Sequence, residues 1–234
     1  MATRLPSLLE RPILFAHRGA RANEREHSLE AFQLAVRLGA TGIQSDAWAT
    51  RDHVVVLNRD PFARRVRRRK IGQVDAADLP DNFVTLTELL EISGDLPIRV
   101  RIDEVAHGPM VIAAARLAES ADRLWLAHTD LEVLAAWRDV APEVQLVNST
   151  SVDNMALGPE RCAAELAAAR VDAVSMPETD WSGGMVALFH RFDVLAFAEG
   201  ADFERQLARL IDMGIDAVTG DHPERMVAVA ATFD

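Results

Sequence analysis

The run Ile13-Leu14-Phe15-Ala16-His17-Arg18-Gly19 begins apolar and ends in residues of a different kind. Its apolar start predicts a β-strand over residues 13–17. His17 then falls at the carboxyl end of that strand, which is where barrel enzymes place their chemistry. A histidine in such a position can also be a core residue satisfied by hydrogen bonds, so the rest of the chain has to decide between the two interpretations.

Short apolar or β-branched runs alternate with longer runs rich in Ala, Leu and Arg along the whole chain, which is typical of βα units around a parallel sheet. The predicted strands cover residues 13–17, 42–47, 98–103, 124–128, 144–148, 173–176, 194–198 and 217–220. Eight strands are the number that closes a (β/α)8 TIM barrel. No linker, repeat or low-complexity tract divides the chain, so we expect one α/β domain over residues 1–234.

The helices between these strands carry ordinary start and stop signals. Side-chain caps are expected at Ser28, Thr85 (in a capping box with Glu88), Asp130, Ser182 and Asp202. Gly39 is expected to end the first helix.

Residues 54–57 (Val-Val-Val-Leu) form an additional strand without a preceding helix, and only Arg51-Asp52-His53 separates it from the second strand. A tight hairpin is the simplest structure for this spacing, and it would bring Asn58 back opposite Asp46. The basic run from Arg64 to Lys70 follows. Such a run is usually a solvated loop. It could instead be a basic rim that attracts an anionic substrate or partner.

Composition limits the classes of function. The chain has 234 residues, is 49% hydrophobic and carries a formal net charge of -11, which argues against general nucleic-acid binding. The single Cys162 excludes an intrachain disulfide and fits a reducing compartment. No cleavage signal and no run near the ~20 apolar residues of a membrane span are present. We therefore expect a cytoplasmic protein without an anchor, and nothing specifies an oligomer.

Several motifs follow Phe15-Ala16-His17-Arg18-Gly19-Ala20 in a fixed order. They are Glu26 in the run Glu-His-Ser-Leu-Glu-Ala-Phe, Gly42-Ile43-Gln44-Ser45-Asp46, Asn58-Arg59-Asp60-Pro61, and Gly214 to Pro223 with its Asp-x-Pro ending. This order resembles the glycerophosphodiester phosphodiesterase family, a TIM-barrel family with PLC-like phosphodiesterase chemistry. The resemblance implies hydrolysis of a small anionic phosphodiester at a site that holds Mg²⁺ or Ca²⁺. It also implies a second catalytic His, a Glu-x-Asp metal pair and a later Glu-x-Lys.

The first two motifs keep their functional residues. By resemblance, His17 is the catalytic acid or base, and Arg18 holds the phosphate through its planar guanidinium. Glu26 matches the glutamate of the family's Pro-Glu-Asn-Thr motif, although its neighbours differ. Arg18 and Glu26 could also simply form a salt bridge.

The next two motifs have lost theirs in part. Gln44 and Asp46 occupy the Glu-x-Asp positions and share one strand face. Asp46 remains a hard oxygen ligand for a metal ion, whereas Gln44 offers only a neutral oxygen. Gln44 could instead fill the barrel mouth as a polar side chain that is hydrogen-bonded to its neighbours. Arg59 stands at the second histidine, or Asn58 if the alignment shifts by one residue. Neither can move a proton near neutral pH, but Arg59 can bind phosphate.

The Glu-x-Lys position departs furthest, because the sequence there is Ile98-Arg99-Val100-Arg101-Ile102-Asp103-Glu104. Our alignment places Arg101 at the acid and Asp103 at the lysine. An arginine in that position repels a divalent cation, and the two side chains could simply pair inside the barrel. In a different register Asp103 is the metal acid, and Val105 then stands at the lysine.

Three hypotheses follow. The first is a phosphodiesterase with a depleted metal site, in which Asp46 and Gln44, with Asn58 or Glu26 as a further ligand, hold a cation weakly and His17 is the sole acid or base. The second is a non-catalytic homologue that binds phosphate through Arg18, Arg59 and Arg101. The third is a barrel that acts through its surface, with the basic run as its partner face. The acids Glu26 and Asp103 would belong to the site in either of the first two. His128 and Asn148 end strands and could line the mouth.

Overall fold

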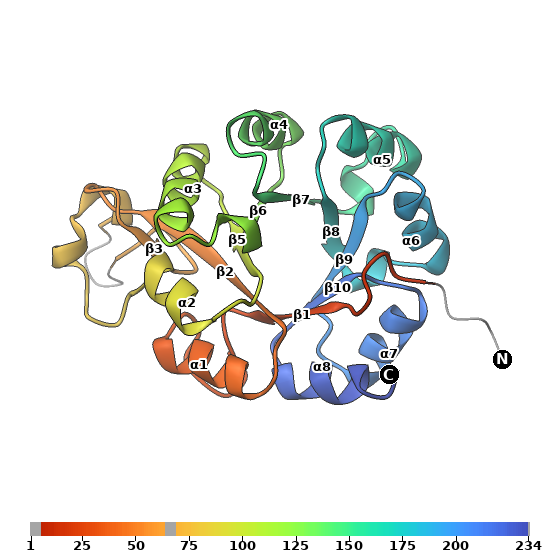
Figure 1. The fold of residues 1–234 in the computed structure, drawn as a ribbon, viewed down its shortest axis with the longest axis horizontal. Coiled ribbons are helices and arrows are strands. Elements are labelled where there is room, and N and C mark those ends of the chain that lie inside the picture. Colours follow the sequence, from red (N-terminus) through yellow and green to blue (C-terminus); the bar gives the residue numbers. More distant parts are fainter. Residues whose placement is uncertain (1–5, 64–68, 234) are drawn as a thin grey trace.

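The structure is a computed structural model that describes residues 6–63 and 69–233. Eight parallel strands close on themselves into a barrel, as the alternating pattern predicted (Figure 1). In order around the barrel they are β1 (Ile13–His17), β2 (Gly42–Ala49), β5 (Ile98–Arg101), β6 (Leu124–His128), β7 (Gln145–Ser149), β8 (Ala173–Pro177), β9 (Leu195–Glu199) and β10 (Ala217–Gly220). The last strand pairs with the first, which confirms the predicted (β/α)8 TIM barrel.

A ring of helices surrounds the strands (Figure 1). It consists of α1 (Leu29–Arg37), α2 (Leu86–Ile92), α3 (Gly108–Leu117), α4 (Leu131–Val140), α5 (Pro159–Ala168), α6 (Gly183–His190), α7 (Glu204–Asp212) and α8 (Pro223–Ala230). The largest cluster of buried apolar side chains lies between this ring and the barrel wall. Burial of this layer is the main source of stability in the fold.

Four of the five expected caps are confirmed. The Ser28 hydroxyl accepts a hydrogen bond from the Ala31 amide at 3.1 Å, and Thr85 forms a complete capping box. Asp130 and Ser182 cap α4 and α6 in the same way. The expected cap at Asp202 is wrong.

Asp202 instead joins two loops at one end of the barrel. The helix α7 begins after Phe203, and the Asp202 carboxylate accepts the backbone amide of Asp221 at 2.7 Å. A side chain expected to cap a helix therefore ties the loop after β9 to the end of β10. Asp221 is held at the same end of the barrel as His17.

The predicted hairpin is also confirmed. β3 (Val55–Leu57) runs antiparallel to β2, and β4 (Val84–Thr85) runs antiparallel to β3. The Asn58 amide donates to the Asp46 carbonyl at 3.0 Å, so Asn58 does return opposite Asp46. This extension projects from one side of the barrel (Figure 1). Of the basic run, residues 64–68 lie outside the described residues. Lys70 pairs with Phe62.

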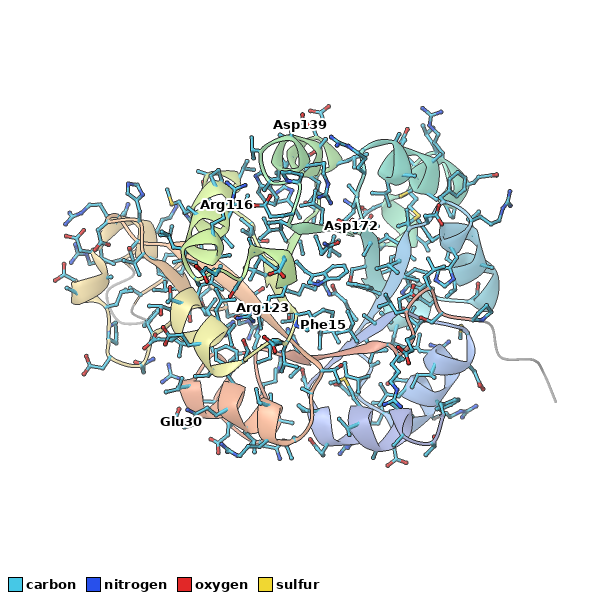
Figure 2. The ribbon with its side chains drawn as sticks, viewed as in Figure 1. Phe15, Glu30, Arg116, Arg123, Asp139 and Asp172 are labelled. Carbon is cyan, nitrogen blue, oxygen red and sulfur yellow. The ribbon has the colours of Figure 1, made fainter. Side chains whose placement is uncertain are left out.

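The inside of the barrel has two different halves. Its amino-terminal half is filled by aromatic rings, with Phe197 centred 5.9 Å from Phe15 and 5.2 Å from Trp125. Figure 2 shows Phe15 pointing into the middle of the barrel. The carboxyl-terminal half is lined by polar side chains from the same strands. A dry, packed floor therefore supports a polar mouth, which is the usual arrangement in this fold.

Candidate functional site

A cavity of about 330 Å³ opens at the carboxyl ends of the barrel strands. It is lined by His17, Arg18, Arg21, Gln44, Asp46, Arg99, Arg101, Pro177, Glu199, Gly200, Asp202, Thr219 and Asp221. Nine of the thirteen lining residues are Asp, Glu or Arg, or the histidine that ends β1. The sequence motifs at the ends of β1 and β2 therefore do meet in one place, which we call the mouth cavity.

The chain leaves β1 through two residues with left-handed backbone conformations. Arg18 has φ of 57° and Gly19 has φ of 83°. A Cβ atom on Gly19 would lie 2.6 Å from the Ala31 carbonyl carbon, so only glycine lets this turn pass against α1. A non-glycine residue at positive φ is uncommon and locally strained. The turn aims the Arg18 side chain at the neighbouring strand.

Arg18 is held between two carboxylates. Its Nε donates to Asp46 Oδ2 at 2.7 Å, and its Nη1 donates to Glu26 Oε2 at 2.9 Å. His27 Nε2 lies 3.4 Å from the same Asp46 oxygen. The salt bridge between Arg18 and Glu26 that the sequence allowed is therefore present, and Asp46 takes part in it.

The charges in this group shift one another's titration. Burial by itself would raise the pKa of Asp46, but the contact with His27 and the charge of Arg18 outweigh it and lower that pKa. In the same way, burial would raise the pKa of Glu26, but the bond and charge of Arg18 lower it overall. Burial lowers the pKa of His27, although Asp46 opposes the shift. At neutral pH both acids are thus ionised and His27 is neutral.

His17 makes its contact with an acid from the last strand of the barrel. Its Nδ1 lies 2.9 Å from Asp221 Oδ1, and Arg21 Nε contacts the other oxygen of Asp221 at 3.1 Å. Burial would raise the pKa of Asp221, but the hydrogen bond and charge of His17 lower it. An ionised carboxylate can only accept, so Nδ1 carries the proton in this bond. Nε2 of a neutral His17 is then the nitrogen left to accept a proton.

Beneath these groups, Arg99 crosses the interior of the barrel. Its side chain is only 3% exposed, and its Nη2 donates to Glu199 Oε1 at 2.6 Å. Ser175 donates to the same oxygen at 2.7 Å. Burial would raise the pKa of Glu199, but the charge of Arg99 lowers it. An ion pair between the buried Arg99 and the Glu199 side chain, which is 46% exposed, thus links β5 and β9 across the mouth cavity.

The pairing of β2 with β5 shows which residues of this segment lie beside Gln44 and Asp46. Gln44 pairs with Arg99, and Asp46 pairs with Arg101, along β2 and β5. Arg99 and Arg101 are therefore the consecutive inward residues, and Asp103 lies beyond the end of β5. Arg101 does pair with Asp103, at 2.9 Å, but both side chains are about half exposed at the rim. The expected pairing is present outside the barrel and not inside it.

Not every residue that we predicted for the site reaches the mouth cavity. His17, Arg18, Gln44, Asp46 and Arg101 line it.

Arg59 lines a neighbouring cavity of about 580 Å³ together with Glu26 and Asn58, and its guanidinium is 4.0 Å from Glu26. Glu26 thus stands in the wall between the two cavities.

His128 Nδ1 accepts the Asp130 amide, and the Asn148 side chain donates to the Thr129 carbonyl. Both side chains are thus bonded to the loop after β6, and neither lines the mouth cavity.

Sequence reasoning missed five charged groups of the mouth: Arg21, Arg99, Glu199, Asp202 and Asp221. The period of two along a strand carries a signal for Arg99, because it places Arg99 on the same face as Arg101. Asp221 stands directly after a predicted strand end, which is a signal of the same kind as for His17. Glu199 was missed because we ended its strand one residue early. Arg21 sits in an irregular turn, for which the sequence carries no periodic signal.

The class of protein that this fold and site define is a TIM barrel with a charged mouth in which four arginines stand beside four carboxylates. Comparison with known proteins then gives the family. The model of the glycerophosphoryl diester phosphodiesterase family matches residues 17–225, so the chain belongs to that family. Members of the family are generally dependent on a divalent metal.

Curated relatives match over part of the chain. The protein named "Probable glycerophosphodiester phosphodiesterase 1" of Mycobacterium tuberculosis is 43% identical over 61 residues, which are 26% of this chain and 21% of that protein. A glycerophosphodiester phosphodiesterase of Caldanaerobacter subterraneus is 32% identical over 107 residues, covering 39% of this chain and 44% of that protein. The matches therefore span less than half the length of either relative.

Solved structures match the fold over nearly the whole chain. The glycerophosphodiester phosphodiesterase of Thermotoga maritima superposes with a TM-score of 0.81 at 21% identity, covering 94% of this chain and 99% of that one. An Oleispira antarctica phosphodiesterase, solved in complex with the product sn-glycerol-3-phosphate, has a TM-score of 0.79 at 18% identity and covers 94% and 97%. Identities this low establish the shared fold alone.

Proposed function

We propose that this chain is a glycerophosphodiester phosphodiesterase-like protein whose metal site is depleted, so that metal-dependent turnover is weak or absent. The observation that carries the proposal is the contact between Arg18 and Asp46. One oxygen of the only carboxylate kept from the Glu-x-Asp pair already accepts a charge-assisted bond at 2.7 Å.

The residues present do not fit a divalent cation. Such ions take several oxygen ligands, preferably carboxylates. Gln44 supplies a neutral oxygen, and the strand beside Gln44 and Asp46 presents Arg99 and Arg101. A guanidinium beside a metal position raises the free energy of the bound ion through charge repulsion. Among residues 6–63 and 69–233, no three His, Cys, Asp or Glu side chains are grouped to hold a metal.

The chain's own residues can still bind phosphate and move one proton. Arg18 and Arg101 bring positive charge to the mouth cavity from two strands, where a guanidinium can bind two phosphate oxygens at once. His17, with its Nδ1 proton held by Asp221, offers Nε2 as a single acid or base. Arg59, or Asn58 if the alignment shifts by one residue, stands in place of the family's second imidazole, and both residues line the neighbouring cavity.

The second candidate function is a non-catalytic protein that binds phosphate or a phosphodiester with Arg18, Arg59 and Arg101 in place of the metal. The cluster of arginines at the mouth favours it, because guanidinium groups bind an anion but do not generate a metal-activated oxygen nucleophile. The Oleispira antarctica phosphodiesterase was solved in complex with sn-glycerol-3-phosphate, which supports a small phosphate ligand for this chain.

Hydrolysis of glycerophosphocholine, followed by release of glycerol phosphate, tests the proposal. We expect little turnover, and no gain when EDTA is replaced by millimolar Mg²⁺ or Ca²⁺. A clear metal-dependent increase that disappears in Asp46→Ala would contradict the proposed depletion.

The same assay separates the two functions. Slow turnover that resists EDTA and is lost in His17→Gln supports the impaired enzyme. Binding of sn-glycerol 3-phosphate by calorimetry, without any turnover above background, supports the non-catalytic homologue.

A further inference from the structure

An arginine in the neighbouring cavity has little contact with the rest of the protein. This cavity has a volume of about 580 Å³ and is lined by residues from the segments 25–27, 58–63 and 80–83. The Arg59 side chain is 67% exposed, and its nearest ionic contact is Glu26 at 4.0 Å. Within residues 6–63 and 69–233 its guanidinium makes no hydrogen bond. A guanidinium carries several N–H donors and no acceptor, so Arg59 can offer these donors to an anion.

The loop that carries Arg59 is fixed by hydrogen bonds of its own side chains. Asn58 Nδ2 donates to the Asp60 carbonyl at 2.8 Å, and Trp48 Nε1 donates to the Asn58 carbonyl at 3.0 Å. The Asp60 carboxylate accepts the Phe62 amide at 3.0 Å. Asp60 is therefore used by the loop itself, and it forms no ion pair with Arg59 in the described part of the chain. The loop holds the backbone of Arg59 in place and leaves its charge uncompensated.

Glu26 connects Arg59 to the mouth cavity. Arg18 Nη1 contacts Glu26 Oε2 at 2.9 Å, and Arg21 Nη1 lies 3.7 Å from the same oxygen. Arg59 approaches the other oxygen of this carboxylate. Arg18 and Arg21 each contact a second carboxylate in the mouth, whereas Arg59 has no second one among the described residues. One acid in the wall thus separates the phosphate-facing Arg18 from a further guanidinium that can bind an anion.

We propose that Arg59 binds a carboxylate on the head group of the ligand, so that the protein selects a phosphodiester with an amino-acid head group. This inference rests on the proposed phosphate-binding function. The phosphate contacts Arg18 on one side of Glu26, and the head group extends past Glu26 into the neighbouring cavity. A planar guanidinium matches a carboxylate with two parallel hydrogen bonds. Both acids of the cavity, Glu26 and Asp60, already accept bonds from the protein, so an anionic group gains more there than a cationic one.

Calorimetric titration with glycerophosphoserine and with glycerophosphoethanolamine, in EDTA at low ionic strength, tests the carboxylate site. The two diesters differ by a single carboxylate on the head group. We expect the wild type to bind glycerophosphoserine about fivefold more tightly than glycerophosphoethanolamine. Arg59→Gln removes the guanidinium and keeps a polar side chain, so this preference should disappear. Added salt should also reduce the preference of the wild type, because Arg59 is exposed.

Arg161→Gln is the matched control. Arg161 is 63% exposed on α5, where it pairs with Glu165, and its replacement changes the net charge of the protein by the same amount. This variant should keep the preference of the wild type for glycerophosphoserine. A preference that is lost in both variants would show that the total charge of the protein produces it, and it would overturn the assignment to Arg59.

Three further outcomes separate failure of this site from failure of phosphate binding. Equal binding of the two diesters by the wild type would overturn the carboxylate site and leave phosphate binding intact. An equal loss of affinity for both diesters in Arg59→Gln would show that Arg59 holds the phosphate that they share, which would also overturn the site. Failure of the wild type to bind either diester or sn-glycerol 3-phosphate would instead refute the phosphate-binding function on which the site rests.

Discussion

The two ends of the barrel use arginine in opposite ways. At the mouth, Arg18 and Arg99 are held by ionised carboxylates beside an open cavity. At the base, Arg123 and Arg138 are held mostly by backbone carbonyls of helix α2 and of the segments that lead into the strands. Figure 2 labels Arg123 close to the barrel wall, and Arg116 on the outer ring of helices. A guanidinium that donates to backbone carbonyls stabilises the fold. A guanidinium that is held by carboxylates beside a cavity can also bind an anionic ligand there.

The acids at the two ends of the barrel differ in the direction of their pKa shifts. At the mouth, burial would raise the pKa of Asp46 and of Asp221, but neighbouring histidines and arginines lower both. At the base, burial raises the pKa of Asp172, and the bonds from Leu146 and Arg138 do not overcome it. The surroundings of the mouth therefore favour the charged form of Asp46 and Asp221, whereas burial at the base disfavours the charged form of Asp172.

The largest effect on folding should come from the base. Arg138→Met removes a buried guanidinium that bonds to three carbonyls and to Asp172. We expect the free energy of unfolding in urea to fall by about 3 kcal/mol, because the carbonyls and the acid are left unpaired. Binding of sn-glycerol 3-phosphate by the folded fraction should not change. A variant as stable as the wild type, or one that lost the ligand while folded, would remove the distinction between the two ends.

The largest effect on binding should come from the mouth. In Arg18→Lys the ammonium cannot make the forked contact of a guanidinium, so we expect the affinity for sn-glycerol 3-phosphate to fall about 10- to 100-fold. Calorimetry measures this directly. Arg37→Lys is the control. Arg37 is exposed at the end of α1, so this variant should bind sn-glycerol 3-phosphate as tightly as the wild type does. Unchanged affinity in Arg18→Lys would show that Arg18 is only structural.

The pH dependence of stability should have opposite signs at the two ends. The folded pKa of Asp46 lies below its ordinary value of 3.8, so its contribution is present above pH 3.8 and is lost as pH falls through the folded pKa. The folded pKa of Asp172 lies above 3.8, so its contribution is present below pH 3.8 and is lost as pH rises through the folded pKa.

Urea unfolding of Asp46→Asn and Asp172→Asn across the acid range checks these signs. On acidification, the advantage of the wild type over Asp46→Asn should shrink, and its stability relative to Asp172→Asn should improve. Parallel curves for the two variants would mean that the two carboxylates titrate alike.

The fold was predictable from the sequence, and the site only in part. Eight alternating runs and ordinary capping signals are local patterns, and each depends on only a few neighbouring residues. The position of His17 followed from the same local rule.

The partners of His17 and Arg99 did not follow, because they come from remote strands. His17 meets Asp221, and Arg99 meets Glu199, across separations of 204 and 100 residues. The closure of the barrel makes those contacts, and no spacing in the sequence encodes them. The strand of Glu199 was predicted to end one residue early, which was enough to hide that residue.

The smallest effect should come from the rim. Arg101 and Asp103 are both half exposed, so Asp103→Asn should change the free energy of unfolding by less than about 1 kcal/mol. Loss of the acid frees the Arg101 guanidinium and removes a negative charge, so affinity for sn-glycerol 3-phosphate should rise about two- to threefold at low salt. A fall in affinity would show that Asp103 itself holds the ligand.

The central claim is that the guanidiniums of the chain, and not a metal, hold the phosphate at the mouth. Titration of the wild type with sn-glycerol 3-phosphate in EDTA, and again in 5–10 mM Mg²⁺ or Ca²⁺ (about the excess that saturates a weak site), tests it most directly. We predict the same dissociation constant in all three buffers and its loss in Arg18→Ala. An affinity that improves tenfold or more with the cation, and loses that gain in Asp46→Asn, would contradict it.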